Sequence, residues 1–339
     1  MTTQVSNTQG QPHDPAMSYE IRESIGKGAF GDVYLVIHKA TKKKYVLKRI
    51  KLARQNEWQR ASTRQEIELV SSLKHPFIVP YIEHWVQHGH TINIIYGYCE
   101  KGDCQSQLQM QKGKLYNEEQ LKVWLCEMAL AIEYMHRKRV LHRDLKTQNL
   151  LMTTDGDLQI ADFGLATFRS EGEDAKHDQA LVGTPHYMSP ELLSQKKYGF
   201  EIDLWSLGCI AYEWSSLRPP FDAFNLTGLV TKIRRGPTPI PPTSYSQDWT
   251  KIIKCLLRKE PEKRSTVYDI LSLPYLQDAL AIAKERGRII MPDYEYPDIQ
   301  PPSPLDSLRL VNDHNLESGT EAPDPARPTG GEAAAAAAG

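Results

Sequence analysis

The first third of the chain carries its apolar residues in short runs, a pattern typical of β-strands. The runs are rich in β-branched and aromatic side chains, and turns that contain glycine or several lysines separate them. Between the third and fourth runs, residues 56–73 place Ile67, Val70 and Leu73 on one face, which predicts a helix. The predicted strands are residues 21–25, 32–38, 44–50, 81–86 and 91–96, the last two joined as a hairpin around Gly89.

From residue 117 onward the apolar spacing becomes helical. Asn117 and Gln120 have the spacing of a capping box, which predicts a helix start. The stripe of large apolar side chains that follows is Leu121, Trp124, Leu125, Met128, Ile132 and Met135. Residues 200–217 are apolar on nearly every face, which predicts a helix buried at the centre of a large lobe. We therefore predict an α+β, two-lobed fold with a small β-rich N-lobe, one main helix in it, and a larger α-helical C-lobe.

Composition divides the chain into three regions. Residues 1–17 are rich in Thr, Gln, Ser and Asn, so we predict a disordered N-terminus. Residues 18–276 form the predicted folded domain, with the N-lobe at 18–98 and the C-lobe at 99–276. Residues 277–339 are predicted to be a flexible tail, because the proline, acidic and small residues that dominate it cannot bury enough apolar surface to offset chain entropy.

Charge and cysteine usage exclude several classes of protein. The 41 Lys and Arg residues balance 42 Asp and Glu residues, so no overall field attracts nucleic acid or an anionic membrane. No apolar run is long enough to span a bilayer, and the N-terminus lacks the apolar segment of a secretory signal. The five cysteines have no CxxC spacing, which favours reduced thiols. We therefore expect a soluble cytoplasmic protein that neither inserts into a membrane nor binds nucleic acid.

A glycine-rich turn between the first two strands predicts a phosphate-binding site. Glycines allow the backbone to close over phosphates and to direct N–H groups at them. A dinucleotide-binding fold uses similar glycine spacing but requires a helix after it, whereas a strand-like run follows here. An ordinary hairpin is the remaining alternative. The residues of this candidate nucleotide site are Ile25, Gly26, Lys27, Gly28, Ala29, Phe30, Gly31 and Val33.

Lys48 lies at the end of the third predicted strand, within an apolar run. A lysine anchored in such a strand is costly unless it is paired, and Glu66 on the following helix is its expected partner. Glu68 is a rival partner, and a solvated lysine on an edge strand is the structural alternative. A paired Lys48 would be directed toward the α- and β-phosphates of a nucleotide.

Two motifs in the middle of the chain have the composition that phosphoryl transfer requires. The segment His-Arg-Asp-Leu-Lys-Thr-Gln-Asn occupies residues 142–149, and an Asp-Phe-Gly motif starts at Asp162. Asp144 is the candidate base for a substrate hydroxyl, and Lys146 can neutralise the charge of the γ-phosphate. Asn149 and Asp162 supply hard oxygen ligands for Mg²⁺, which binds few protein ligands together with phosphate oxygens.

In this order and spacing, the motifs of residues 19–276 resemble a eukaryotic protein kinase domain. Residues 183–191, which contain Ser-Pro-Glu, resemble the end of the activation segment of NIMA-related kinases. Residues 99–103 resemble the post-hinge segment of that family. The resemblance implies a protein kinase-like fold and an ATP-dependent serine/threonine protein kinase that uses ATP and Mg²⁺ and acts on Ser and Thr hydroxyls of protein substrates.

The resemblance also implies further roles for particular residues. Val33, Val46 and Leu151 should sandwich the adenine. The backbone at Gly97 and Cys99 should hydrogen-bond the edge of the adenine, and Asp103 should reach the ribose. Structural supports are implied as well. Residues 142–149 correspond to the catalytic loop of the family, and Asp203 should brace this loop. The other supports are Thr184 near Asp144 and Lys146, Glu191 paired with Arg264, and His142 and Phe163 packed beneath the site.

Several positions depart from the family pattern. Tyr96 occupies the gatekeeper position. Gln148 stands where kinases that select basic substrates often carry an acidic residue, so we expect no strong preference for an Arg upstream of the phosphorylated residue. Ala180 stands where the family carries its activating Thr, which leaves Arg143 without that phosphate partner. We expect activity without phosphorylation at position 180, with the segment ordered otherwise or through Ser170 or Thr167.

Two kinds of function fit these residues. The first is an active kinase with a monomeric kinase domain, and the family resemblance suggests cell-cycle, microtubule or ciliary roles near those structures, with a nuclear location also open. The alternative is a pseudokinase that acts as a binding scaffold. Every residue that the chemistry needs is present, which favours the enzyme.

Overall fold

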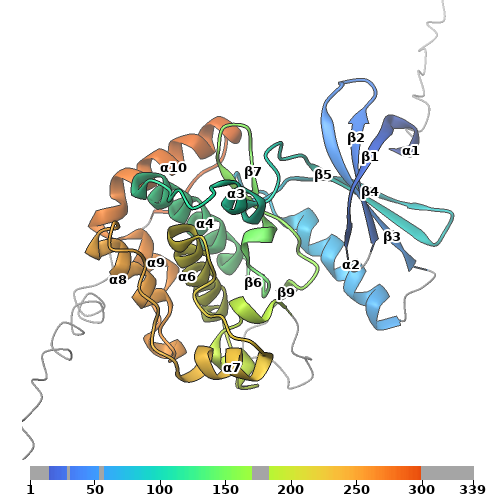
Figure 1. Ribbon diagram of the computed structural model, residues 1–339. Helices are drawn as coiled ribbons and strands as arrows, with labels where there is room; N and C mark the ends of the chain where they lie inside the picture. The colour runs from blue at the N-terminus through green and yellow to red at the C-terminus, as the bar shows by residue number, and fades with distance from the viewer. Residues whose placement is uncertain (1–14, 29–30, 53–56, 170–182, 299–339) are drawn as a thin grey trace, which may run out of the picture. The chain divides into compact units, whose positions relative to one another are not determined.

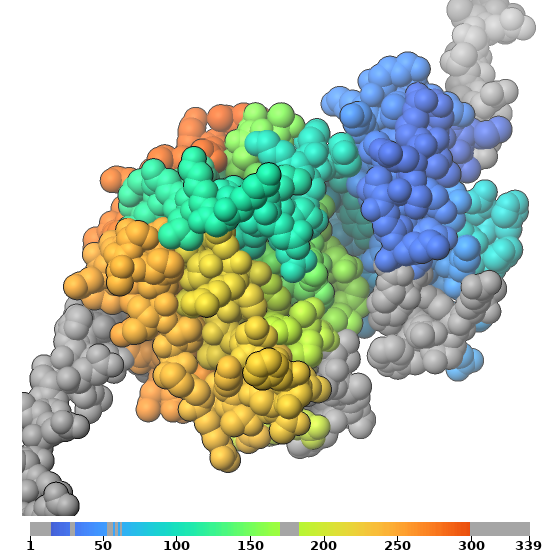
Figure 2. All heavy atoms as spheres, viewed as in Figure 1, coloured from blue at the N-terminus to red at the C-terminus, as the bar shows by residue number. Residues whose placement is uncertain are grey.

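The computed structural model describes residues 15–28, 31–52, 57–169 and 183–298. Within these ranges the chain forms two lobes, a five-stranded β-sheet with helix α2 beside it and a larger, mainly helical part (Figure 1). Figure 2 shows the two lobes as separate masses with a recess between them on the face in view. The predicted α+β, two-lobed fold is confirmed.

The N-lobe sheet is antiparallel throughout, with the strand order β1-β2-β3-β5-β4. All of the strands predicted from the apolar runs are present, and so is the predicted helix. Their bounds are β1 (Tyr19–Gly28), β2 (Gly31–His38), β3 (Lys44–Lys51), α2 (Glu57–Ser72), β4 (Tyr81–Gln87) and β5 (Thr91–Gly97). Gly89 has a φ of +70° in the turn between β4 and β5, a conformation that costs glycine little.

The alternation of side chains along β3 decides which of them face α2. Leu47 is buried on one face of the sheet, so its neighbour Lys48 points to the opposite face, as Ile50 does. The cluster on the first face consists of Tyr19, Val36, Leu47 and Ile95, and the cluster toward α2 consists of Ile50, Ile67, Ile92 and Ile94. The strand period therefore directs Lys48 toward the helix that carries Glu66.

The C-lobe surrounds two buried helices, α4 and α6. All residues from Leu121 to Met135 in α4 are buried, so the predicted apolar stripe lies in a helix that is covered on all sides. The predicted central helix is α6, which is buried from Ile202 to Ser215. The other helices pack around this pair, and none of the helices in the described ranges is long and apolar enough to cross a bilayer. The helix bounds are α3 (Cys104–Met110), α4 (Glu118–Arg137), α5 (Pro190–Leu193), α6 (Glu201–Ser216), α7 (Leu226–Arg235), α8 (Gln247–Leu256), α9 (Val267–Leu271) and α10 (Gln277–Ile290).

Short strands in the C-lobe hold the loops of the candidate site. β7 (Leu150–Met152) pairs with β8 (Leu158–Ile160), and β6 (Val140–Leu141) pairs with β9 (Thr167–Phe168). The segment between α2 and β4 is hydrogen-bonded to β8: the Val79 N–H donates to the Ile160 carbonyl at 2.9 Å, and the Gln159 side chain donates to the Pro76 carbonyl at 2.8 Å. The end of α2 is therefore attached to the C-lobe, which limits where Glu66 can lie.

The start of α4 follows the prediction in part. Asn117 is the N-cap, and its side chain accepts the Glu119 N–H at 2.9 Å. The predicted capping box is absent from this helix, because in the described structure the Gln120 side chain accepts no hydrogen bond from the Asn117 N–H.

Secondary structure continues beyond both ends of the predicted domain. Residues 15–18 form the short helix α1 (Pro15–Ser18), although disorder is predicted up to residue 17. Residues 277–290, predicted to begin a flexible tail, form α10, which packs on α4 through the buried residues Ala279, Leu280 and Ala283. The apolar face of α10 is narrow and built largely of alanine, so it yields a weak pattern in the sequence. The predictions of disorder for residues 1–14 and of flexibility for residues 299–339 concern residues outside those that the structure describes.

Gly287→Ala is predicted to destabilise the C-lobe. A Cβ at Gly287 would overlap the Tyr296 hydroxyl and lie 3.1 Å from Cγ of Pro76. Overpacking of this kind costs about 1–3 kcal/mol, which exceeds the gain of about 0.5–1 kcal/mol that alanine brings to a helix. Thermal unfolding should show a lower midpoint. Adding Tyr296→Phe should recover part of the loss, since the Tyr296 hydroxyl has no hydrogen-bond partner in the described structure. An equal or higher midpoint for Gly287→Ala would contradict the packing.

His75 is predicted to make stability depend on pH. Its Nδ1 accepts the Phe77 N–H at 3.1 Å, and its ring lies 4.8 Å from the Tyr294 ring and 5.1 Å from the Tyr134 ring. Burial, assisted by the charge of Arg137, lowers the pKa of His75 to about 3. The unfolded chain therefore binds a proton that the folded chain does not, so stability is complete above about pH 6.5 and falls as the pH decreases toward 3.

Urea unfolding of the wild type and of His75→Asn at pH 7 and pH 5 measures this effect. The wild type should lose about 2 kcal/mol more than the variant over that interval, because one pKa unit corresponds to about 1.4 kcal/mol. The comparison removes the contributions of other groups, which both proteins share. Parallel pH profiles would contradict the prediction.

Candidate active site

Lys48 and Glu66 form an ion pair between β3 and α2. Lys48 Nζ lies 2.5 Å from Glu66 Oε1, and Glu66 is 5% exposed, whereas the rival partner Glu68 is exposed. Burial alone would lower the pKa of Lys48, but the negative charges of Glu66 and Asp162 outweigh burial and raise this pKa above its ordinary value. Lys48 is therefore charged at neutral pH, and the structure contains the pairing expected from the sequence.

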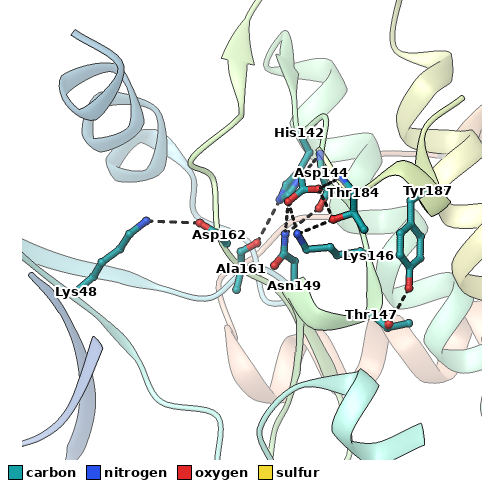
Figure 3. A network of polar contacts seen from close by, with 10 residues as sticks. All are labelled: Lys48, His142, Asp144, Lys146, Thr147, Asn149, Ala161, Asp162, Thr184 and Tyr187. Atoms are coloured by element: carbon teal, nitrogen blue, oxygen red, sulfur yellow. Dashed lines mark hydrogen bonds and ion pairs between the residues drawn. The ribbon is translucent and has the colours of Figure 1, made fainter. Parts of the chain in front are cut away.

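Asp162 connects this pair to the C-lobe. Its Oδ1 lies 3.5 Å from Lys48 Nζ, as the dashed line in Figure 3 shows, and its side chain is 55% exposed. Burial would raise the pKa of Asp162, but the charge of Lys48 lowers it below the ordinary value. The residue has a φ of +60°, a left-handed conformation that aspartate tolerates better than most residues. The result is an ionised carboxylate that faces the space beside Lys48.

Asp144 is the centre of a second polar network, formed by the catalytic loop (Figure 3). Lys146 Nζ lies 2.6 Å from Asp144 Oδ2 and donates to Thr184 Oγ1 at 3.0 Å. Asn149 Nδ2 donates to the Asp144 carbonyl at 2.8 Å, and the Thr184 N–H donates to Asp144 Oδ1 at 3.2 Å. These contacts hold the Asp144 carboxylate in one orientation, and they join the candidate base, the candidate phosphate-binding lysine and one candidate metal ligand.

Asp203 on α6 holds the catalytic loop through hydrogen bonds to its backbone. Its carboxylate accepts the backbone N–H of His142 at 3.1 Å and of Arg143 at 3.0 Å, and His136 Nε2 lies 2.9 Å from it. Burial would raise the pKa of Asp203, but the hydrogen bond and charge of His136 lower it. Arg143 has a φ of +67°, so these bonds stabilise a backbone conformation that L-residues rarely adopt. A loop that must present Asp144 is thereby fixed to the buried central helix.

His142 and Phe163 are packed against each other beneath the polar residues of the site. Both are buried, their rings lie 5.0 Å apart, and His142 Nε2 lies 3.3 Å from the Ala161 carbonyl oxygen. Burial lowers the pKa of His142, although nearby carboxylates act in the opposite direction. The imidazole is therefore neutral at physiological pH and can donate to Ala161, which links the catalytic loop to the residue before Asp162.

A buried group that the sequence reasoning missed lies behind the catalytic loop. The Tyr187 hydroxyl donates to Glu213 Oε2 at 2.5 Å and lies 3.0 Å from Thr147 Oγ1, which also contacts Glu213. Burial raises the pKa of Glu213, although the bonds from Tyr187 and Thr147 oppose this. The three residues join α6, the activation segment and the catalytic loop. No spacing signal in the sequence could have found them, because they lie 26 to 66 positions apart.

The glycine-rich turn joins β1 and β2 as a hairpin. Lys27 is opposite Asp32 and Gly28 is opposite Gly31 in the strand register, while Ala29 and Phe30 lie outside the described residues. A Cβ on Gly31 would overlap the Arg49 carbonyl oxygen on β3. Gly31 is therefore needed for the close approach of two strands as well as for any contact with phosphate.

The residues expected around adenine come from both lobes. Val33 is opposite Lys48 and Leu35 is opposite Val46 in the β2–β3 register, so Val33, Val46 and Lys48 share one face of the sheet. Leu151 on β7 forms a bridge with Asp103, which brings the C-lobe residue next to the segment between the lobes.

The segment from Gly97 to Asp103 connects the lobes. The Gly97 N–H donates to the Pro80 carbonyl at 2.8 Å. A Cβ on Gly97 would lie 2.7 Å from Cγ of Pro80, so any larger residue at this position would require the Pro80 ring to move. Cys99 is buried, and its Sγ donates to Gln159 Oε1 at 3.3 Å. The carboxylate of Asp103 caps α3 by accepting from the N–H and hydroxyl of Ser106, a role not foreseen from the sequence.

The oxygen atoms at the site suit a hard divalent cation. Because Asn149 Nδ2 donates to Asp144, the Oδ1 atom of Asn149 remains as a possible ligand, and the exposed carboxylate of Asp162 offers another. No group of three or more His, Cys, Asp or Glu side chains in the described ranges is placed to hold a metal ion. Two oxygen ligands from the protein fit Mg²⁺, which takes its other ligands from water and phosphate.

The activation segment is described at its two ends. Arg143 Nε donates to the Leu165 carbonyl at 2.6 Å, and Thr167 on β9 accepts a hydrogen bond from the Gln65 side chain at 3.2 Å. Ala180 and Ser170 lie outside the described residues. At the far end, Glu191 on α5 pairs with Arg264 at 2.7 Å, as the family resemblance implies.

Comparison with known proteins gives the same assignment. The sequence model of the protein kinase domain matches residues 19–276. The serine/threonine-protein kinases Nek6 and Nek3 of Oryza sativa subsp. japonica are 42% and 40% identical over 275 and 278 residues, which is 81% of this chain in each case. The mouse serine/threonine-protein kinase Nek4 is 38% identical over 272 residues, 80% of this chain.

The matched regions cover 51% of rice Nek6, 47% of rice Nek3 and 34% of mouse Nek4. The chain therefore spans about half the length of these two rice proteins and about a third of the mouse protein. The similarity thus concerns the kinase domain, where the Lys48–Glu66 pair, the Asp144 network and Asp162 lie together. The chain belongs to the protein kinase family, and its domain resembles those of the NIMA-related Nek serine/threonine kinases.

Proposed function

We propose that this chain is an ATP-dependent protein kinase that transfers the γ-phosphate of ATP to Ser and Thr hydroxyls of proteins, with Mg²⁺ as cofactor. The observation that carries the proposal is the Lys48–Glu66 ion pair with Asp162 at 3.5 Å from the same lysine. Kinase chemistry requires this pair and the aspartate of the Asp-Phe-Gly motif to be in place together.

In the proposed reaction, the substrate hydroxyl gives its proton to the Asp144 carboxylate as its oxygen bonds to the γ-phosphorus. The bond between that phosphorus and the β,γ-bridging oxygen breaks, and ADP leaves. Lys146, held 2.6 Å from Asp144, is placed to neutralise charge on the transferred group. Mg²⁺ held by Asn149 and Asp162 would neutralise the charge that develops on the phosphate oxygens.

The nucleotide contacts are part of the same proposal. Lys48 would bind the α- and β-phosphates under the backbone of the glycine-rich turn, residues 25–31. Val33 and Val46 from the sheet and Leu151 from β7 would contact the two faces of the adenine. Backbone groups of Gly97 and Cys99 would bind its edge, and Asp103 would have to share its carboxylate between Ser106 and the ribose.

We further propose that transfer does not require a phosphate at position 180, where alanine cannot carry one. Arg143 Nε donates to the backbone carbonyl of Leu165 at 2.6 Å. This contact supports the proposal, because it orients Arg143 through the backbone and not through a phosphate. From the resemblance to Nek kinases, we also propose a cytoplasmic role linked to the cell cycle, microtubules or cilia. We propose that the kinase domain acts as a monomer.

The test is a transfer assay with the purified chain after complete phosphatase treatment. With γ-labelled ATP, Mg²⁺ and a protein substrate, we expect labelled phosphoserine or phosphothreonine and no phosphotyrosine. Label on tyrosine alone would contradict the substrate class. Absence of transfer, with activity gained by Ala180→Thr after phosphorylation, would contradict the proposed independence from a phosphate at this position.

A further inference from the structure

A cavity with a basic lining lies in the C-lobe, apart from the candidate active site. Its volume is about 440 Å³, within the range of about 300–1,000 Å³ typical of ligand pockets. Three segments form it: the first residues of α5 together with residues 194–197, the C-terminal turn of α7, and residues 259–262. We call it the basic cavity, after its cationic residues Lys196, Lys197, Arg234, Arg235 and Lys259.

The charges around the basic cavity do not cancel. Of the three carboxylates in its lining, Glu191 is bound in a bidentate pair by the buried Arg264, at 2.7 Å and 3.0 Å. Glu260 and Glu262 remain against Lys196, Lys259 and the two arginines Arg234 and Arg235, which leaves a local charge of +2 when Lys197 is not counted. The whole chain has a net charge of −1, so this surplus is a local feature.

The cations at the mouth of the cavity are available to a ligand. Arg234 and Arg235 are exposed, and no carboxylate in the described ranges pairs with either. Lys259 has a structural role: its Nζ donates to the Ile233 carbonyl at 2.6 Å and lies 4.4 Å from the centre of the Phe221 ring. Lys259 thus holds the wall of the cavity, while the two arginines present forked donors that suit carboxylates.

A purely structural explanation accounts for only part of this arrangement. Basic residues in the last turn of α7 complement the negative end of its helix dipole, which explains Arg234 and Arg235 individually. It does not explain why Lys196, from a different segment, borders the same cavity. Glu260 and Glu262 offset only part of the repulsion among these cations, and a bound anion would relieve the rest.

The position of the cavity relates it to the substrate. Its lining includes Pro190 and Glu191, which follow directly on the segment where Thr184 contacts Asp144 and Lys146. In the catalytic loop itself, Gln148 is exposed and uncharged where an acidic residue would attract basic substrates. The basic surface near the end of the activation segment therefore favours a substrate that carries negative charge over one that carries positive charge.

We propose that the basic cavity binds an acidic segment of the protein substrate, in which several Asp or Glu side chains lie close together. This rests on the proposed kinase function and adds a substrate class to it. The lining contains no aromatic side chain on which a base could stack, and two glutamates interrupt the basic surface, which disfavours a nucleic acid strand. A peptide can place its carboxylates against the cationic residues and away from these two glutamates.

The direct test is fluorescence anisotropy of the full chain with a labelled peptide rich in Asp and Glu and with its Asn and Gln counterpart. The wild type should bind the acidic peptide about tenfold more tightly, which corresponds to about 1.4 kcal/mol of binding free energy. Arg234→Gln with Arg235→Gln should remove most of that difference. Lys251→Gln with Lys254→Gln, on the exposed face of α8 outside the cavity, removes the same charge and should change binding less than about twofold.

A kinetic arm separates this proposal from the proposed function. A short neutral Ser peptide should be phosphorylated equally by the wild type and the Arg234→Gln, Arg235→Gln variant. The same peptide extended by an acidic segment should have a lower KM with the wild type alone. Phosphorylation of neither peptide would refute the kinase function, whereas equal binding of the acidic peptide by wild type and variant would overturn the docking site. Tighter binding of an RNA oligonucleotide than of the acidic peptide would also overturn it.

Discussion

Asp162→Ala is expected to abolish phosphoryl transfer while leaving the chain folded. The side chain is 55% exposed and makes its ion pair at 3.5 Å with Lys48, so truncation leaves no buried cavity. It does remove the carboxylate that faces Lys48 and the proposed metal ligand. Loss of one preorganised electrostatic group in an active site costs about 10²–10³-fold in rate, and loss of a metal ligand adds to this, so we expect at least about 10³-fold.

Incorporation of label from γ-labelled ATP in the presence of Mg²⁺ measures this loss. Asp162→Asn is the matched variant, because asparagine tolerates the φ of +60° that alanine adopts only with strain, and it removes the charge alone. Glu68→Ala, on the exposed side of α2, is the control and should retain activity. Equal incorporation by wild type and Asp162→Ala would refute the assignment as an enzyme and favour the scaffold alternative.

Arg264→Ala is expected to cause a large loss of stability, because its side chain is buried in the C-lobe. The Arg264 side chain is fully buried, Glu191 is 4% exposed, and the two form a bidentate pair at 2.7 Å and 3.0 Å. Arg264 also donates to the carbonyls of Glu201 and Arg258. Removing the guanidinium leaves a buried carboxylate without its counter-charge, which typically costs about 3–5 kcal/mol.

Urea unfolding gives this free energy, and a double-mutant cycle with Glu191→Ala gives the coupling. The double variant should be more stable than the sum of the single losses predicts, because it contains no unpaired buried charge. Arg288→Ala is the comparison at the surface, where the exposed pair with Glu285 at 3.3 Å should contribute less than about 1 kcal/mol. A loss below about 1 kcal/mol for Arg264→Ala would contradict the role of the pair.

The fold could be predicted where the apolar period is strong and local. The strands of the N-lobe and the central helix α6 carry patterns that depend only on residues within a few positions of one another. Helix α10 was missed because its buried residues, Ala279, Leu280 and Ala283, become an apolar face only when α4 lies opposite them. A narrow, alanine-rich face has little signal of its own.

The candidate site divides in the same way. Lys48, Glu66, Asp144 and Asp162 could be named from the sequence, because the chemistry of phosphate and metal requires those residue types in that order. The N-cap role of Asp103 could have been inferred from its place before α3. The left-handed backbone at Arg143 and Asp162 could not, since neither residue type requires it.

The sequence by itself determined the elements, the two lobes, the chemistry-bearing residues and, through the alternation along β3, the face to which Lys48 points. These properties follow from steric periods of two and 3.6 residues and from the chemical needs of phosphoryl transfer. Only the tertiary structure decided which distant groups meet: Tyr187 with Glu213, Tyr296 against Gly287, and three separate segments around the basic cavity. Contacts between residues far apart in the chain depend on how whole elements pack, and no local pattern contains that information.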